Sequence, residues 1–545
     1  MVAAVTAADT GEASVTRAAA HMGVATAASR TIGFARILVV AGVLGTTFLG
    51  NAYQSSNAVS NVLFELLAAG ALSAVLVPTF VAHLDRGDQA ETERLAGRVL
   101  GVALVALGVV AVVGIIGAPL IADVLTSGVS NPRIAAQQRD LSTFLLRFVI
   151  PQILLYAVGA VAVAVLYAKR RLAVTAMAPV GLTVVVVIAM GLFRLVAGPD
   201  PGLDLTLGER LILALGATFG VVAFVAIPTV ALWRTGFRLI PRLGRRDAAV
   251  GHVLRLSSWA VFQHSMIGLL LLAAIVVGNT VEGGTVAYQV AWVFFLAPYA
   301  ILAQPVHTAI LPDLSRQADD PEHFNVSLRW ALDSMAVLVI PVSAGLVALA
   351  LPIMEVAAFG QATKAGGVGL LAAALASLAV GLYTYCAFLL FARAYYALGD
   401  SRTPAVVALV SAAVGIAVMV VGGGLTSGRE TVAFLGLGQS AAYAVGAVVL
   451  WVGLARRTGH LIVPRSLGRS VVVAVPLGAA AWGLFQVVDP GGRVATLLML
   501  VGVTLIGGLV YVFVLRALGG VPSLHPVPPS RAVAPSDDMS TEPSP

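Results

Sequence analysis

Long apolar segments separated by short polar ones recur along this chain. Residues 99–122, for example, contain no charged side chain. A helix needs roughly 20 mostly apolar residues to cross a membrane. By this measure we expect about fourteen membrane-spanning helices, at residues 20–48, 51–82, 97–125, 139–168, 172–197, 209–233, 252–278, 284–312, 326–357, 366–398, 403–424, 430–455, 468–488 and 493–516. The predicted fold class is an all-α membrane protein.

Composition supports the same class. Hydrophobic residues make up 59% of the chain and charged residues only 11%, whereas soluble proteins carry about 25% charged residues. So few charges could not cover a water-exposed surface. The net charge of +7 indicates cationic loops at an anionic membrane surface rather than a nucleic-acid partner.

Charge also predicts the orientation. An even number of spans places both termini on one side. With the termini inside, twenty-two of the 33 Lys and Arg residues fall in inside segments, seven outside and four within spans. Positively charged loops favour the cytoplasm, so we expect both termini inside a bacterial cytoplasmic (inner) membrane. The predicted cytoplasmic parts are residues 1–19, a linker at 234–251, either amphipathic on headgroups or a plain solvated loop, and a Pro- and Ser-rich disordered tail at 517–545.

An internal repeat divides the chain in two. The matches are Ala52-Tyr53-Gln54 with Ala287-Tyr288-Gln289, Pro78 with Pro312, and Tyr167-Ala168 with Tyr396-Ala397. Equivalent helices run in the same direction. This predicts two pseudo-symmetric six-helix lobes, at 20–233 and 252–455, plus two C-terminal helices within 456–516. Two similar lobes around a central cavity are typical of transport by alternating access.

Arginines within the spans are the first candidates for function. A charge at the centre of a spanning helix costs about 2.5–3.5 kcal/mol on insertion scales. Arg30 and Arg36 lie in the first span, and we expect them to face an anionic substrate; the alternative is that one extends to the membrane surface. Arg147, four residues before a helix-breaking Pro151, is a second candidate for substrate binding or a structural residue. Arg393 is expected to be an interfacial anchor.

The second span is unusually polar for a membrane helix. Asn51, Gln54, Asn57, Asn61 and Glu65 fall within fifteen residues. Gln54, Asn57 and Asn61 recur at helical spacing and predict one amide-lined face. Such a face avoids lipid, so we expect it to line a wet cavity; the alternative is a polar contact between helices. Glu65 could pair with one of the first-span arginines.

Motifs for catalysis are not found. The sequence contains no phosphate-binding Gly loop with Lys, no HExxH, no GxSxG and no acidic pair typical of a metal site. We therefore expect no cofactor and no enzymatic activity. Transport would be driven by an ion gradient or the membrane potential rather than by ATP.

Several segments resemble one known family. SRTIGFARILVVAGVLG, NAYQSSNAVSNVLFELLAAGALSAVLVPTF, LRFVIPQILLY, ILPDLSRQ and FARAYYALGDSRTPA resemble, in order, parts of the MurJ (MviN) family of lipid II flippases, across residues 20–455. The resemblance implies a transporter of the multidrug/oligosaccharidyl-lipid/polysaccharide superfamily. Its substrate would be lipid II, its other partners membrane lipids and cell-wall synthesis proteins, and Arg30 and Arg36 would face the pyrophosphate. The last two helices would offer a groove for the polyprenyl tail.

Other positions depart from the family pattern, because charges usual in the family are replaced by neutral residues: Ile37, Asn51, Phe64, Ala69 and Trp292. A divergent flippase is the favoured interpretation. The alternatives are a flippase for another polyprenyl-linked oligosaccharide, a cation-coupled drug exporter, or a non-transporting scaffold for cell-wall assembly. An exporter should carry a deep carboxylate, and only Glu65 is a candidate.

Overall fold

The computed structural model describes residues 31–64, 80, 81, 84, 86–242, 248–364 and 366–520. Regular structure within them is helical throughout. The first half contributes a helix at Thr31–Leu44, α2 (Phe48–Phe64), α4 (Gln89–Ile116), α5 (Ala118–Thr126), α6 (Pro132–Val149), α7 (Gln152–Ala168), α8 (Leu172–Ala197) and α9 (Leu207–Trp233). The second half contributes α10 (Ala248–Gly278), α11 (Gly284–Pro298), the π-helix η2 (Tyr299–Ala303), α12 (Gln304–Arg316), α13 (Pro321–Ala348), α14 (Ala350–Ala357), the 3-10 helix η3 (Gly360–Thr363), α15 (Gly367–Ala379), α16 (Leu382–Ala397), α17 (Arg402–Leu425), α18 (Gly428–Thr458), α19 (Arg465–Val487) and α20 (Arg493–Ala517).

The described helices confirm a multi-pass membrane protein. Eleven are long and apolar enough to cross a membrane, and counting the bent pair α15–α16 as one span makes twelve. These correspond to the third through the fourteenth of the expected spans. The first two expected spans are described only in part, as Thr31–Leu44 and α2. The described residues therefore account for up to twelve of the fourteen expected spans. That the first two segments also cross the membrane stays a prediction.

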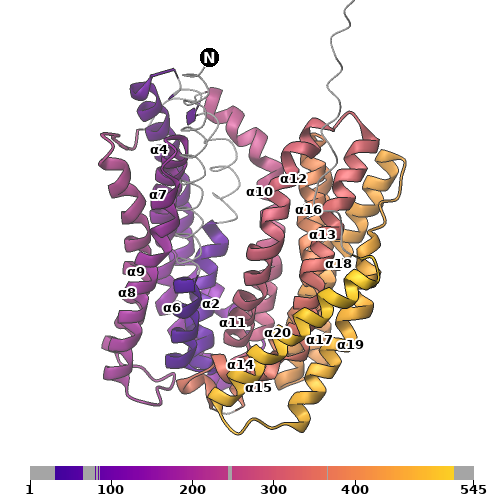
Figure 1. Ribbon diagram of the computed structural model, residues 1–545. Coiled ribbons are helices and arrows are strands. Elements are labelled where there is room, and N and C mark those ends of the chain that lie inside the picture. Colours follow the sequence, from indigo (N-terminus) through magenta and orange to yellow (C-terminus); the bar gives the residue numbers. More distant parts are fainter. Residues whose placement is uncertain are drawn as a thin grey trace, which may run out of the picture.

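The helices form two bundles that lie side by side (Figure 1). We call the helices from Thr31–Leu44 to α9 the N-lobe and those from α10 to α18 the C-lobe. In the N-lobe α8 packs along α9, and in the C-lobe α17 packs along α18. The last two helices pack on the C-lobe, α19 against α13 and α20 against α14. This confirms the predicted fold of two lobes plus two C-terminal helices; the exact domain boundaries stay predictions.

Each lobe has a hydrophobic core of its own. Tyr288 and Phe388 lie in the C-lobe core, and Phe193 lies in one of two N-lobe clusters. Few buried residues cross over: Ala41 of the first helix joins the C-lobe core, and Ile275 of α10 joins an N-lobe cluster. The lobes are therefore largely self-contained, which suits movement of one against the other.

Several of the expected spans are interrupted, among them the fourth, the eighth and the tenth. The helix break expected at Pro151 is present, because α6 ends at Val149 and α7 begins at Gln152; proline cannot donate the helical hydrogen bond and crowds the preceding turn. In the eighth expected span η2 separates α11 from α12. In the tenth, α15 and α16 meet at an angle of 45°.

The segment after α9 follows α4 closely. The Arg242 N–H donates to the Gly97 carbonyl at 2.8 Å. A methyl group at Gly97 would lie 2.3 Å from the Ile240 carbonyl oxygen, and one at Gly101 would lie 2.2 Å from the Arg242 carbonyl oxygen. Because glycine has no Cβ, it allows the backbone of residues 240–242 to lie this close to α4. The described part of the expected linker is thus held on the N-lobe, and its contact with lipid headgroups stays a prediction.

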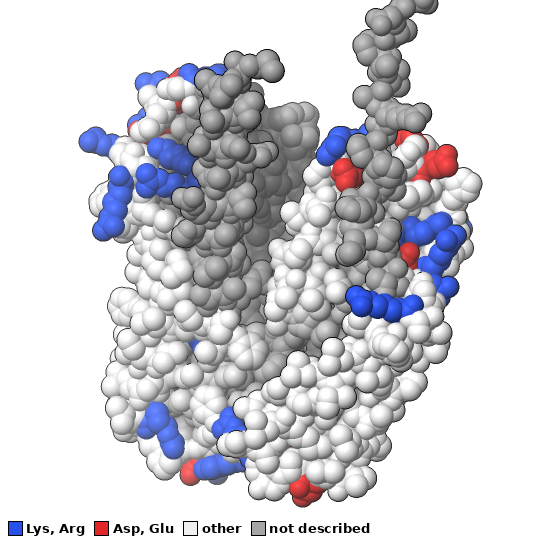
Figure 2. All heavy atoms as spheres, in the orientation of Figure 1, with Lys and Arg blue, Asp and Glu red and all other residues white. Residues whose placement is uncertain are grey.

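The two ends of the bundles differ in charge. One end of the bundles, which we call the basic end, carries cationic residues at the helix termini: Lys169, Arg171, Arg234, Arg402 and Arg456. Lys and Arg side chains gather at the top of the N-lobe, and on the C-lobe they lie near its top and along its right side in Figure 2. We call the opposite end the far end. Hydrogen bonds between the described residues of the two lobes lie toward the far end, from Asn51 to the Val281 carbonyl and from Asn279 to the Leu125 carbonyl.

Candidate functional site

The lobes are joined at the far end by a buried polar contact. Asn51, in the first turn of α2, is fully buried. Its Nδ2 donates to the Val281 carbonyl at 2.8 Å, and its Oδ1 accepts from the backbone N–H groups of Thr285 at 3.1 Å and Val286 at 3.4 Å. Asn51 therefore caps the start of α11 from the other lobe.

This cap in trans has a clear physical cause. A helix leaves its first N–H groups without partners inside the helix. The residue before α11 is Gly283, which cannot cap with a side chain and has a φ of +73°. A Cβ there would lie 2.4 Å from the Thr46 carbonyl carbon. The amide of Asn51 accepts from α11 and also donates to Val281. A carboxylate at this position could not make that donation.

A second amide extends the contact. Asn279, also buried, donates through Nδ2 to the Leu125 carbonyl of α5 at 2.9 Å. Its Oδ1 accepts from the Ser55 hydroxyl of α2 at 3.0 Å and from the Thr285 hydroxyl at 2.8 Å. Buried hydrogen bonds of this kind are strong in a low-dielectric interior and costly to leave unmade. We call Asn51, Ser55, Asn279 and Thr285 the inter-lobe seam.

An ion pair at the surface also joins the two lobes at the far end. Lys364, after η3, pairs with the Asp200 carboxylate in the α8–α9 loop, which also accepts from Gln361 Nε2 at 2.9 Å. The hydrogen bond from Lys364 lowers the pKa of Asp200 below its ordinary value. A carboxyl with a lowered pKa keeps its ion pair above its usual pKa and loses it as the pH falls through the lowered one. The pair is therefore complete at neutral pH.

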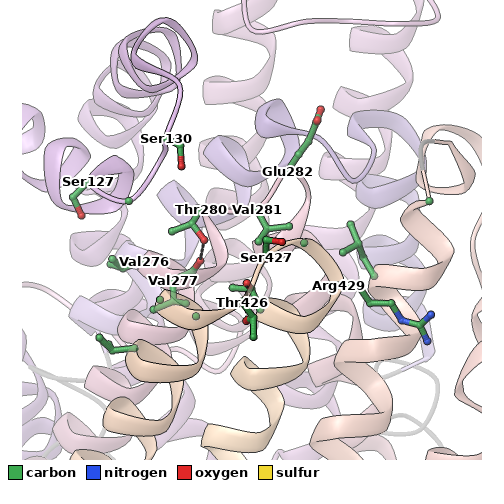
Figure 3. A pocket seen from close by; sticks show the side chains of 18 of the residues that line it. Ser127, Ser130, Val276, Val277, Thr280, Val281, Glu282, Thr426, Ser427 and Arg429 are labelled. Carbon is green, nitrogen blue, oxygen red and sulfur yellow. Dashed lines mark hydrogen bonds between the residues drawn. The ribbon is translucent and has the colours of Figure 1, made fainter.

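A pocket of about 1120 Å³ opens beside the seam at the far end. Both lobes line it. Ser127 and Ser130, from the turn after α5, lie across from Val277 and Thr280, from the end of α10 (Figure 3). Glu282 and Arg429 are at its rim, with side chains directed away from one another (Figure 3).

Arg36 is the predicted first-span arginine that the structure describes. It lies in the helix Thr31–Leu44, its side chain is half-buried, and its Nε is enclosed without a hydrogen-bond partner among the described residues. The guanidinium lies near the phenol groups of Tyr53 on α2 and Tyr156 on α7. A buried N–H without a partner costs free energy, so this position suits an anionic ligand.

The other predicted residues are less fully described. Gln54 and Asn57 are both half-buried on α2, and Asn57 Nδ2 donates to the Tyr53 carbonyl at 2.9 Å. Arg147 is exposed on the last turn of α6. Arg30, Glu65 and the side chain of Asn61 lie outside the described residues, and so does the expected pairing of Glu65 with an arginine. A role for these residues in substrate binding stays a prediction.

Sequence reasoning missed Ser55, Asn279 and Thr285 as partners of Asn51. Asn51 and Ser55 are four residues apart and share a helix face, a signal available in the sequence. Asn279 and Thr285 flank a Gly-containing loop between two apolar spans. Their pairing with α2 joins positions 224 and 234 residues apart, and no local pattern indicates that.

The fold and the seam together define an all-helical, multi-pass membrane protein of two lobes joined at one end. A family model described as "Lipid II flippase MurJ" matches residues 40–502. The chain belongs to this family.

Individual relatives are distant in sequence. The "Lipid II flippase MurJ" of Burkholderia cenocepacia is 26% identical over 388 residues, which are 70% of this chain and 73% of that protein. A solved structure, "Lipid II flippase MurJ, inward closed conformation", is similar with a TM-score of 0.72 at 18% identity, covering 91% of this chain and 99% of the other. A multidrug resistance MATE family transporter of the MOP superfamily, in an inward-facing conformation, gives a TM-score of 0.61 at 12% identity, covering 79% and 94%. These structures show a shared fold.

Replacing Asn51 with Ala is expected to weaken closure at the far end. The change leaves the Val281 carbonyl and the Thr285 N–H without their partner, and each buried unsatisfied group costs about 1–3 kcal/mol. A membrane-impermeant maleimide should therefore label a Thr280→Cys reporter faster in the Asn51→Ala background. Asn131→Ala is the matched control, because Asn131 caps only its own helix α6. Equal labelling with and without Asn51→Ala would show that the seam does not hold the lobes together.

Proposed function

We propose that this protein is a lipid II flippase, which moves undecaprenyl-pyrophosphate-linked peptidoglycan precursor from the cytoplasmic to the outer leaflet. Membership of the MurJ family supports this function. The observation that carries it in this chain is Arg36, a half-buried guanidinium within a span with an unpartnered Nε among the described residues. A pyrophosphate is a strong acceptor for guanidinium N–H groups. Such transport needs binding and release and no chemical step, which is why we regard the protein as a transporter rather than an enzyme.

We further propose that the basic end faces the cytoplasm, with both chain termini. The excess of cations there supports this orientation. The seam then closes the outer side, and substrate would enter from the basic end. Alternating access requires the seam to open while the lobes approach at the basic end. We assign Asn51 to this closure. Arg30, Arg36, Gln54, Asn57, Asn61, Glu65 and Arg147 remain proposed substrate contacts.

The driving force we propose is the membrane potential or an ion gradient. In vesicles that hold purified protein and labelled lipid II, an imposed potential is expected to drive transfer without ATP, and added ATP should change nothing. Transfer is measured as the fraction of lipid II that an impermeant reagent can reach. A requirement for ATP would point to a partner ATPase, and failure to move lipid II under any condition would contradict the proposed function.

One departure from the family favours a second candidate substrate. Trp292 is one of the neutral residues expected to replace a charge usual in the family, and its ring stacks on Phe295 at 5.2 Å and meets Tyr385 edge-on at 6.2 Å between centroids. An aromatic cluster there supplies no charge. A flippase for another polyprenyl-linked oligosaccharide therefore stays the alternative, and the same vesicles with a polyprenyl pyrophosphate that carries a different sugar distinguish the two. Contact with cell-wall synthesis proteins stays a prediction.

A further inference from the structure

A pocket of about 480 Å³ lies between α8 and α9 at the basic end. Two guanidiniums border it, from Arg171 at the start of α8 and Arg234 at the end of α9. Below them the lining is apolar: Val174, Ile227, Val230 and two alanines. Because α8 and α9 are antiparallel neighbours, their cationic ends meet at one membrane face.

Nothing in the described part of the chain neutralises these two cations. Neither Arg171 nor Arg234 has an ion-pair partner there, and no Asp or Glu of that part lines the pocket. The neighbouring Lys169 differs, since its Nζ lies 5.1 Å from the centre of the Phe237 ring and 3.3 Å from the Thr235 hydroxyl. Arg171 is also the N-cap of α8, and no side chain caps that end. Uncapped N–H groups at a helix start favour an anion.

The surroundings of the pocket face lipid. Trp233, beside Arg234, is 71% exposed, and Val230 is 44% exposed. Tryptophan is enriched at the membrane interface, where its ring sits at headgroup level. Along the pair, glycines bring the helices together: a Cβ at Gly181 would lie 3.0 Å from the Ala223 carbonyl oxygen, and one at Gly220 2.8 Å from Leu182. The pair therefore packs tightly within the span and leaves room at its basic end.

The pocket is separate from the seam and from the other lobe. Only α8 and α9, with their terminal residues, line it, and both lie on the flank of the N-lobe away from the C-lobe (Figure 1). A ligand here would reach the pocket from the surrounding bilayer. Its chemistry would be a phosphate group at headgroup level with an apolar chain below.

We propose that this pocket binds an anionic phospholipid of the leaflet at the basic end. The phosphodiester lies between Arg171 and Arg234, and an acyl chain follows the apolar lining. Guanidinium groups bind phosphate oxygens by charge-assisted hydrogen bonds, and basic pockets between spanning helices suit anionic headgroups. A neutral phospholipid carries the same chains and an added positive charge, so the pocket discriminates against it.

Fluorescence of Trp233 tests the proposal directly. The full-length protein is placed in phosphatidylcholine vesicles that contain either brominated phosphatidylglycerol or brominated phosphatidylcholine at equal fraction. The chain has six Trp residues, so the Trp233 signal is taken as the difference from a Trp233→Phe variant. Brominated phosphatidylglycerol is expected to quench this signal more strongly. Each cation near an anionic surface contributes roughly a fivefold preference, so Arg171→Gln with Arg234→Gln should reduce the preference by roughly ten- to thirtyfold.

The control removes the same two charges elsewhere. Arg456→Gln with Arg465→Gln alters two exposed arginines that do not line the pocket, and the preference should remain. Equal quenching by both lipids in the parent protein would overturn the proposal, as would loss of the preference in the control. A third arm adds a polyprenyl pyrophosphate at low concentration. If it displaces brominated phosphatidylglycerol from Trp233, the pocket is a substrate site and the phospholipid assignment is wrong.

Discussion

Oxidation of a Gly128→Cys/Thr280→Cys variant is expected to abolish lipid transport, and reduction to restore it. The two positions belong to different lobes, in the turns after α5 and α10. A Cβ built on Gly128 lies 3.7 Å from the Thr280 Cβ, within the range of about 3.5–4.5 Å found in disulfides. The crosslink would hold the far end closed. Because alternating access requires this end to open, the effect should approach complete arrest, measured as lipid II transfer in vesicles before and after reductant.

Two features of the chain make this experiment clean. The only native cysteine is Cys386, which is buried, so the introduced pair should react with each other. Gly128→Cys with Thr280→Ala is the matched control: it relieves the contact of 2.5 Å between that Cβ and the Thr280 methyl group but cannot form the disulfide. Normal transport by the fully crosslinked protein would rule out opening of the seam as a step in transport.

Arg36→Ala is expected to abolish complementation of a strain depleted of its own lipid II flippase. The change removes a charge-assisted contact worth about 1.5–3 kcal/mol, or roughly ten- to a hundredfold in affinity for the pyrophosphate. It also removes a buried N–H that has no partner within the described structure, so folding should be kept. Arg36→Lys should restore part of the activity, because it keeps the charge and loses the bidentate geometry.

A control separates charge from site. Arg133→Ala removes an exposed cation at the start of α6 and should complement fully. The amount of membrane-inserted protein and its thermal unfolding midpoint should be similar in all variants. Full rescue by Arg36→Ala at normal expression would refute the role of Arg36 in binding, and a lowered unfolding midpoint would indicate a structural role.

The apolar segments determined most of the fold. A run such as residues 99–122 is too long for a membrane β-strand, and in lipid its backbone is satisfied as a helix. Proline at position 151 coincides with the break between α6 and α7, and the Ala-Tyr-Gln repeat predicts equivalent positions for α2 and α11. These are local properties, and the structure agrees with them.

The direction of the polar groups was decided only by the tertiary structure. From the sequence Asn51 was expected to contact substrate with Gln54 and Asn57; in the fold its amide is taken up by Val281 and Thr285. An amide can donate and accept in any direction, so its spacing along a helix predicts which face it occupies but not what that face meets. Its partners lie 230 and 234 residues away. Only the packing of the two lobes brings them within hydrogen-bond distance.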